Sequence, residues 1–165
     1  MIAIVALGSN LGDSAQVLRD AMARLQEFSD EPVSRSSLWQ TTPVDCPPGS
    51  PPFLNAVIGL APRTAETPES LFEKLHALEE AFGRLPKKIL NEPRPLDLDL
   101  IAFGNATRET SSLTLPHPRA HQRRFVLEPL NEIAPDLILP GQTQTVAALL
   151  AALPAMETEK QKDQP

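Results

Sequence analysis

The chain has 165 residues, of which 41% are hydrophobic and 22% are charged, and its formal net charge is −6. This size and composition fit one globular domain with its own core. The acidic balance argues against nucleic-acid binding, which normally requires a basic patch. We expect no membrane span, because no apolar run approaches the required length, and no signal peptide. The single Cys46 excludes an internal disulfide and fits a cytoplasmic protein.

The first predicted elements are a strand and a helix. The apolar, β-branched run at residues 2–8 predicts a buried strand, and the Gly/Asn/Asp segment after it predicts a loop. Asp13 and Gln16 form a capping-box pattern, which predicts the start of a helix. The helix is amphipathic, because apolar residues recur at a helical period. They are Val17, Leu18, Ala21, Met22, Leu25 and Phe28.

Two more strands and a second helix follow. Strands are predicted at residues 33–40 and 53–60, with a proline-rich loop at 41–52 between them. Thr67 and Pro68 then have the pattern of an N-cap and a first helical residue. The helix carries an apolar stripe and is predicted to end at Gly83. The stripe consists of Leu71, Leu75, Leu78 and Phe82.

Residues 94–104, "RPLDLDLIAFG", read as a strand with two acidic positions. Because side chains alternate along a strand, Asp97 and Asp99 point to one face and the leucines around them point into the core. One interpretation is an edge strand with an acidic, solvated face. The other is a divalent metal site, since oxygen ligands on a rigid strand suit Mg²⁺, which usually also takes phosphate oxygens.

The order strand, helix, strand, strand, helix, strand is the ferredoxin-like βαββαβ pattern. It predicts an α+β domain of two layers, with the sheet on one side and the helices on the other. Extra short helices are expected near residues 119–133 and 144–153. We expect a single domain over residues 1–154 and a disordered tail at 155–165.

Basic residues flank the acidic strand in an otherwise acidic chain. The segment before it carries Arg84, Lys87 and Arg94, and "LPHPRAHQRRF" at 115–125 carries His117 among arginines. The plain interpretation is a solvated basic loop. However, carboxylates that bind metal and arginines that grip phosphate are the groups that a phosphoryl-transfer site requires.

Three further features are ambiguous when each is taken alone. His76 and Glu79 lie three residues apart on one face of the second helix, which is typical of a solvated face. Phe53 and Asn55 share one face of a strand, where a flat ring and an amide could hold a planar heterocycle. The "GSNLG" segment could bind an anion through backbone amides, although a plain tight turn is the better interpretation of this segment taken alone.

The motifs "GSNLG", "T-x-P", "F-L-N", "GR", "P-R-x-x-D-L-D-L" and "L-P-H-P" occur here in this order. Together they resemble the hydroxymethyl-dihydropterin pyrophosphokinases (HPPK) of folate biosynthesis, over about residues 2 to 140. The resemblance implies a ferredoxin-like fold and Mg²⁺-dependent transfer of pyrophosphate from ATP to the hydroxymethyl group of a reduced pterin, with release of AMP. It implies small-molecule substrates and two Mg²⁺ ions. From the acidic composition we expect no nucleic-acid partner, and no obligate protein partner is evident in the sequence.

The resemblance also assigns roles to residues. It implies that Asp97 and Asp99 bind the metals and that Arg84 and Arg94 are catalytic. Residues implied to contact ATP are His76, Glu79, Lys87, His117 and Arg123. Residues implied to hold the pterin are Thr41, Pro43, Val44, Phe53, Asn55 and Phe125.

The chain departs from the family pattern in three places, one of which is a slight difference in the length of the "TTPVDCPP" loop. Asn91-Glu92 replaces an aromatic–Gly pair, and Pro86 stands where a second loop arginine is common. Two alternatives to the family activity remain: a ferredoxin-like binding or regulatory module without activity, and a Mg²⁺-dependent kinase that acts on another heterocycle.

Overall fold

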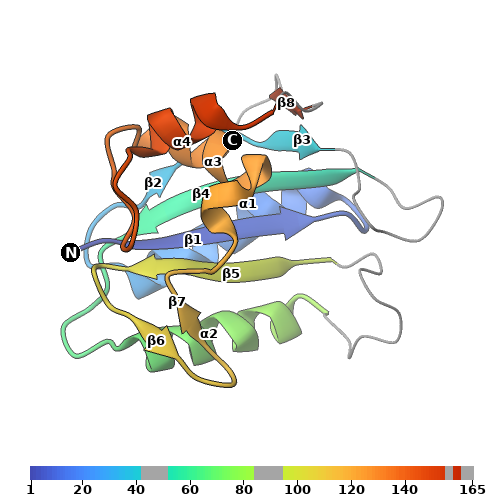
Figure 1. Cartoon of the computed structure of the whole chain (residues 1–165). Coiled ribbons are helices and arrows are strands. Elements are labelled where there is room, and N and C mark those ends of the chain that lie inside the picture. The colour runs from blue at the N-terminus through green and yellow to red at the C-terminus, as the bar shows by residue number, and fades with distance from the viewer. Residues whose placement is uncertain (42–51, 84–94, 155–157, 161–165) are drawn as a thin grey trace.

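The computed structural model describes residues 1–41, 52–83, 95–154 and 158–160. Helices and strands alternate in the first two thirds of the chain, and short helices dominate the last third (Figure 1). In chain order, the elements are β1 (Ala3–Ser9), α1 (Ser14–Leu25), the 3-10 helix η1 (Gln26–Phe28), β2 (Ser34–Arg35), β3 (Trp39–Thr41), β4 (Phe53–Leu60), α2 (Pro68–Ala81), β5 (Asp97–Phe103), β6 (Arg108–Glu109), β7 (Thr114–Leu115), the 3-10 helix η2 (Ala120–Gln122), α3 (Arg124–Ile133), α4 (Val146–Ala152) and β8 (Thr158–Lys160).

The main sheet is antiparallel, with strand order β5-β1-β4-β3-β8, and the short β2 also pairs with β4. β5 is therefore an edge strand, with β1 as its neighbour in the sheet. β6 and β7 form a separate hairpin that the sequence analysis did not predict. β8 falls within the segment 155–165, for which we expected disorder, and its backbone pairs with β3.

Helices cover both faces of the sheet, so the prediction of two layers accounts for only part of the fold (Figure 1). On one face, residues of α1 and α2 such as Leu18 and Leu75 pack in the larger core with Leu7 of β1. On the other face, α3 and α4 pack over Ile4 and Val57 in a second core. This third layer exists because the central strands carry apolar side chains on both faces, and each face must be covered.

The helix starts follow their sequence signals closely. Asp13 caps α1 by accepting a hydrogen bond from the backbone of Gln16 over 3.3 Å. Only this half of the predicted capping box is formed at α1, and the Gln16 side chain lies along the helix, where its nitrogen donates to Asp20 over 2.8 Å. Thr67 caps α2 as predicted, and Ser70 completes a capping box there.

The strand predicted at residues 33–40 is broken into β2 and β3. At the break, the backbone N–H of Ser36 donates to the Val57 carbonyl over 3.0 Å. The Ser36 hydroxyl accepts the Val57 N–H over 2.9 Å, where a continuous ladder would use a backbone carbonyl. A side-chain acceptor thus replaces a backbone one, so the chain stays attached to β4 without remaining a regular strand.

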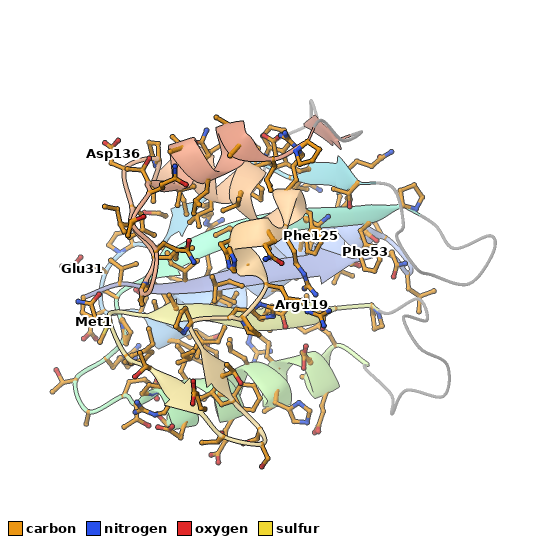
Figure 2. All side chains as sticks on the ribbon, in the orientation of Figure 1. Met1, Glu31, Phe53, Arg119, Phe125 and Asp136 are labelled. Atoms are coloured by element: carbon orange, nitrogen blue, oxygen red, sulfur yellow. The ribbon has the colours of Figure 1, made fainter. Side chains whose placement is uncertain are left out.

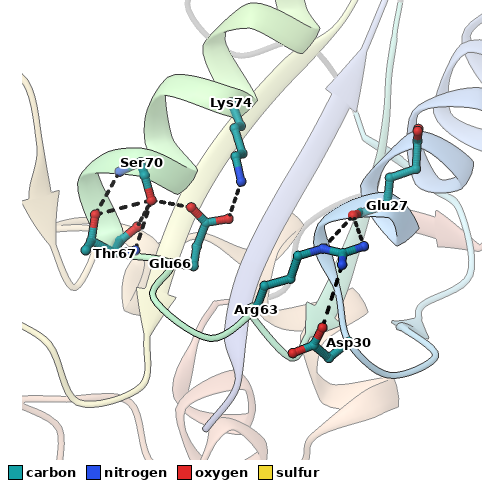
Figure 3. A network of polar contacts seen from close by, with 7 residues as sticks. All are labelled: Glu27, Asp30, Arg63, Glu66, Thr67, Ser70 and Lys74. Atoms are coloured by element: carbon teal, nitrogen blue, oxygen red, sulfur yellow. Dashed lines mark hydrogen bonds and ion pairs between the residues drawn. The ribbon is translucent and has the colours of Figure 1, made fainter.

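A polar network fixes the loop between β4 and α2 (Figure 3). Arg63 donates two hydrogen bonds to the backbone carbonyl of Glu27, at 3.1 and 2.7 Å, which ties this loop to η1. Glu66 pairs with Lys74 over 2.7 Å and accepts from the Ser70 hydroxyl. Its side chain is only 3% exposed, so this buried carboxylate has charged and neutral donors, as buried charges require.

Candidate active site

The sheet face that α3 covers carries five of the predicted site residues on β3, β4 and β5. They are Thr41, Phe53, Asn55, Asp97 and Asp99. The strand register places Asp97 of β5 beside Gly8 of β1, and Gly8 beside Asn55 of β4. Trp39 of β3 continues the row, because it is the cross-strand partner of Asn55. Cross-strand partners point to the same face, so an acidic, a small and an amide residue stand in line across three strands.

The acidic strand has the orientation predicted from its alternation. Leu98 and Leu100 are 6% and 4% exposed and belong to the core on the α1–α2 side. Asp97 and Asp99 are half-buried and alternate with them, so both face the opposite side. The carboxylates therefore stand on a strand that is anchored by buried leucines, which holds them in place before any ligand binds.

Glu79 lies at the outer edge of this acidic strand. Its Oε2 atom accepts the backbone N–H of Leu98 over 2.7 Å, and the residue is 5% exposed. It therefore supplies an acceptor on the side of β5 where the described residues form no further strand. His76 is mainly exposed, with its ring nitrogens 3.5 Å from Glu79 Oε1 and 3.2 Å from Glu80 Oε1. The predicted pair thus meets beside the edge of β5, outside the row of Asp97 and Asn55.

Asn55 and Thr41 form the polar part of the face on β4 and β3. The Asn55 side-chain nitrogen donates to the Thr41 hydroxyl over 2.9 Å, and the residues are 6% and 7% exposed. Gly8 is the reason that Asn55 fits. A Cβ atom added at Gly8 would lie 3.3 Å from Asn55 Oδ1 and 3.8 Å from the ring of Phe53. The missing side chain thus leaves space between the acidic strand and the amide.

The segment between β7 and α3 brings the basic residues over the same face. The His117 backbone N–H donates to the Ile101 carbonyl over 2.9 Å, which attaches this segment to β5. Arg123 lies over Phe125, with its guanidinium carbon 5.4 Å from the ring centroid. Phe53, Phe125 and Arg119 are all at the same end of the sheet (Figure 2). Rings and positive charges therefore gather near the two carboxylates.

The electrostatics of this segment keep His117 neutral near pH 7. Burial lowers the pKa of its imidazole, and the charges of Arg123 and Arg119 lower it further, against the opposing effect of Asp97. Its Nδ1 atom accepts the backbone N–H of Arg119 over 3.2 Å. The single ring proton is therefore assigned to Nε2, so the neutral ring can donate a hydrogen bond from that atom.

Some predicted residues fall outside the part of the chain that the structure describes. They are Pro43, Val44, Arg84, Lys87 and Arg94, and the departures at Pro86, Asn91 and Glu92.

Sequence reasoning assigned no role to two residues that the structure places here, Gly8 and Arg119. Arg119 stands in a cluster of basic residues, which was a usable signal. Gly8 opens the "GSNLG" motif, but the motif does not show that its missing side chain leaves room for Asn55, because that depends on which side chain lies opposite.

The donor set fits Mg²⁺ bound together with phosphate. Asp97 and Asp99 offer only oxygen atoms from a fixed strand, which is the ligand type that Mg²⁺ prefers. Within the described ranges, no group of three or more His, Cys, Asp and Glu side chains could form a complete protein cage for a metal. A site with two protein carboxylates leaves positions for water and phosphate oxygens, as is usual for Mg²⁺.

The sequence matches a family model described as 7,8-dihydro-6-hydroxymethylpterin-pyrophosphokinase (HPPK) over residues 4–135. The chain belongs to the HPPK family. It is therefore an enzyme of the pyrophosphokinase class of folate biosynthesis. The HPPK match includes the acidic strand, the Phe53–Asn55 pair and the basic segment before α3.

Curated relatives support this membership over most of the chain. A 2-amino-4-hydroxy-6-hydroxymethyldihydropteridine pyrophosphokinase of Synechocystis sp. is 38% identical over 148 residues, which is 90% of this HPPK chain and 74% of that relative. The enzyme of the same name from Haemophilus influenzae is 37% identical over 140 residues, or 84% of this chain and 85% of the relative.

A solved structure shows the same fold at low identity. A Plasmodium falciparum HPPK-DHPS has a TM-score of 0.71 and 14% sequence identity, and the match covers 91% of this chain. It covers 45% of the solved chain, so the present HPPK chain spans less than half of that larger protein. In the part of the present chain that is described, no helix has the length and apolar character needed to cross a bilayer.

Proposed function

We propose that this protein transfers the β,γ-pyrophosphoryl group of ATP to the hydroxymethyl group of 6-hydroxymethyl-7,8-dihydropterin and releases AMP. The observation that carries this proposal is the row Asp97, Gly8 and Asn55 on one sheet face. Adjacent strands are about 4.8 Å apart, so roughly 10 Å separates the acidic strand from the amide strand. A flat heterocycle with a short hydroxymethyl arm can bridge that span.

The acidic end of the row suits the phosphates. We infer that Asp97 and Asp99 hold two Mg²⁺ ions, whose charge offsets the charge that develops on phosphate oxygens. His117, with its proton on Nε2, and Arg123 cover the same face and can donate to those oxygens. Arg84 and Arg94 would complete the charge around the transferring group, and His76, Glu79 and Lys87 would contact ATP.

The amide end of the row suits the pterin. Asn55 can accept and donate at the heterocycle edge, with its orientation fixed by Thr41. Phe53 and Phe125 are aromatic residues of β4 and α3 at the same end of the sheet, so they can cover the two ring faces (Figure 2). Pro43 and Val44 would complete this pocket.

The chemistry needs no covalent intermediate on the protein. The hydroxymethyl oxygen attacks the β-phosphorus of ATP and gives up its proton to solvent. The bond from that phosphorus to the α-phosphate oxygen breaks, and AMP leaves with that oxygen. The chain contributes by holding the two substrates in line and by excluding water. The hydrogen-bond donors on the His117 segment stabilise the negative charge on the phosphate oxygens. Substrate positioning and this electrostatic stabilisation together account for the acceleration of the transfer.

The proposal extends to the fold and its setting. The β5-β1-β4-β3 sheet with α1 and α2 would be a ferredoxin-like catalytic core, within a single domain over residues 1–154. We propose a cytoplasmic enzyme that acts on small molecules without an obligate protein partner.

An AMP-release assay tests the function. Protein, ATP, Mg²⁺ and hydroxymethyl-dihydropterin should yield AMP and pyrophosphorylated pterin in equal amounts, without ADP. Omitting the pterin should stop AMP release, and Asp97→Asn serves as the inactive control. Formation of ADP, or transfer only to another heterocycle, would favour the other-kinase alternative. Binding of pterin without AMP release would favour a binding module.

A further inference from the structure

The two walls of the proposed pterin pocket come from different parts of the fold. Thr41, Phe53 and Asn55 stand on β3 and β4, whereas Phe125 stands in the first turn of α3. The distance between these walls determines whether a flat ring fits between the two aromatic residues. A direct polar contact between α3 and β3 would therefore control the pocket without touching the ligand.

Glu132, near the end of α3, makes such a contact with β3 and the residues before it. Its Oε1 atom accepts the indole N–H of Trp39 over 2.5 Å and the backbone N–H of Ser37 over 3.0 Å. Its Oε2 atom accepts the Ser37 hydroxyl over 2.8 Å. Three donors on one carboxylate define the position of α3 relative to this segment, because charge-assisted hydrogen bonds are short and directional.

The contacted segment leads directly into the pocket. Ser37 lies in the break between β2 and β3, where the regular backbone ladder is interrupted. Trp39 is the cross-strand partner of Asn55, and Thr41 follows two residues later on the same face. The Glu132 contact therefore holds the start of the strand whose Thr41 hydroxyl orients Asn55.

On α3, Glu132 and the aromatic wall are also linked by geometry. Phe125 and Glu132 are seven residues apart, so they lie on one side of the helix about 10 Å apart along its axis. A ring stacked on Phe125 is thus too distant for Glu132 to contact directly. Because one helix carries both residues, a shift of α3 at Glu132 moves Phe125 as well.

We propose that Glu132 is a positioning residue for the pterin: it fastens α3 to β3 and so sets the separation between Phe125 and the Thr41–Asn55 pair. This inference rests on the proposed function. If Glu132 has this role, removing its contact should lower the affinity for the pterin but not the affinity for ATP. The residues proposed to bind the ATP phosphates stand on β5, whereas the Glu132 contact holds β3.

The experiment compares the full-length parent with Glu132→Ala and Glu132→Gln. Titration calorimetry measures affinity for hydroxymethyl-dihydropterin and, separately, for a non-hydrolysable ATP analogue with Mg²⁺. For Glu132→Ala we expect pterin affinity to fall by about tenfold, on the scale of one or two lost charge-assisted hydrogen bonds, and ATP-analogue affinity to change by less than about twofold. Glu132→Gln should lose less, because its amide oxygen still accepts one donor.

Two controls separate positioning from general stability. Asp136→Ala removes an exposed acid just beyond α3, at the opposite end from Phe125, and should leave both affinities unchanged (Figure 2). Trp39→Phe removes one of the donors to Glu132. Its effect on pterin affinity should therefore be non-additive with that of Glu132→Gln, because both substitutions weaken the same contact. If Glu132→Ala does not fold, Trp39→Phe carries the same expectation of selective pterin loss.

Fluorescence shows whether the contact has been broken. Trp39 is the single tryptophan and the chain has no tyrosine, so intrinsic emission reports on this indole. In Glu132→Ala the wavelength of maximum Trp39 emission should shift. A shifted maximum with unchanged pterin affinity would overturn the positioning role, as would equal losses for pterin and the ATP analogue. A parent that binds no pterin would overturn the proposed function itself, which is a different result.

Discussion

The side-chain nitrogen of Asn55 donates a hydrogen bond to the hydroxyl oxygen of Thr41 over 2.9 Å. The bond crosses from β4 to β3 and fixes the amide plane. It also leaves Oδ1 on the side of Gly8, because a Cβ atom added there would lie 3.3 Å from this oxygen. The orientation of one amide thus depends on a hydroxyl on one neighbouring strand and a missing side chain on the other.

The first prediction concerns this hydrogen bond. Asn55→Ala should weaken pterin binding by more than about 1 kcal/mol, because the groups that pair with the heterocycle edge are lost. Thr41→Val should weaken it less, since the amide remains but is free to rotate. Calorimetry with pterin measures both, and affinity for the ATP analogue should stay unchanged. Parent-like pterin binding by Asn55→Ala would place the pocket elsewhere.

The second prediction concerns Gly8. In Gly8→Ala the new methyl group would crowd Asn55 Oδ1 and would approach Phe53, so the amide must shift by a few tenths of an ångström. We expect KM for the pterin to rise by several-fold, with a smaller effect on KM for ATP. Gly59→Ala is a matched control, because Gly59 lies on β4 and its nearest neighbour would be Ile2, away from the site. Equal effects of the two substitutions would argue against a specific role for Gly8.

The third prediction concerns the acidic pair. Asp97→Asn and Asp99→Asn should remain folded, because both side chains face away from the α1–α2 core. Each should lower kcat by about 100-fold or more, the usual scale for losing one electrostatic group in a transition-state site. Thermal melts establish folding, and turnover is measured across a Mg²⁺ titration. Near-parent turnover at saturating Mg²⁺ would remove these residues from the metal site.

The fourth prediction concerns stability at low pH. Burial raises the pKa of the Glu66 carboxyl, but hydrogen bonds from Lys74 and Ser70 and the charges of Lys74 and Arg63 outweigh it, so the pKa lies below 4.5. A depressed folded-state pKa means that the stabilisation is present above pH 4.5 and is lost as the pH falls through the folded-state pKa. Glu66→Gln should cost about 1–2 kcal/mol at pH 7.

Denaturant unfolding at pH 7 and at pH 3 tests this expectation. The difference in unfolding free energy between parent and Glu66→Gln should shrink at the lower pH, because the stabilisation by the Glu66 charge is lost as the pH falls toward and through its depressed folded-state pKa. Glu73→Gln is the control, as an exposed acid on α2, the helix that follows Glu66. A difference that is the same at both pH values would show that the Glu66 charge contributes nothing to stability.

The sequence by itself determined the elements whose signals are local. The alternation around Asp97 and Asp99 correctly predicted which side chains enter the core, and the Thr67-Pro68 signal correctly placed the start of α2. The motif order also indicated the family, which the family model and the relatives confirm. These signals are readable because strand alternation and helix capping depend on residues only two to four positions apart.

Only the tertiary structure decided the features that depend on partners far along the chain. The third layer forms because α3 and α4 pack against the sheet face that carries Ile4 and Val57. No local sequence pattern shows that these distant segments pack together. The break at Ser36 depends on a hydroxyl bonded to β4, and the row from Asp97 to Asn55 depends on strand register. Such contacts join residues that are tens of positions apart, and their geometry is set by packing rather than by propensity.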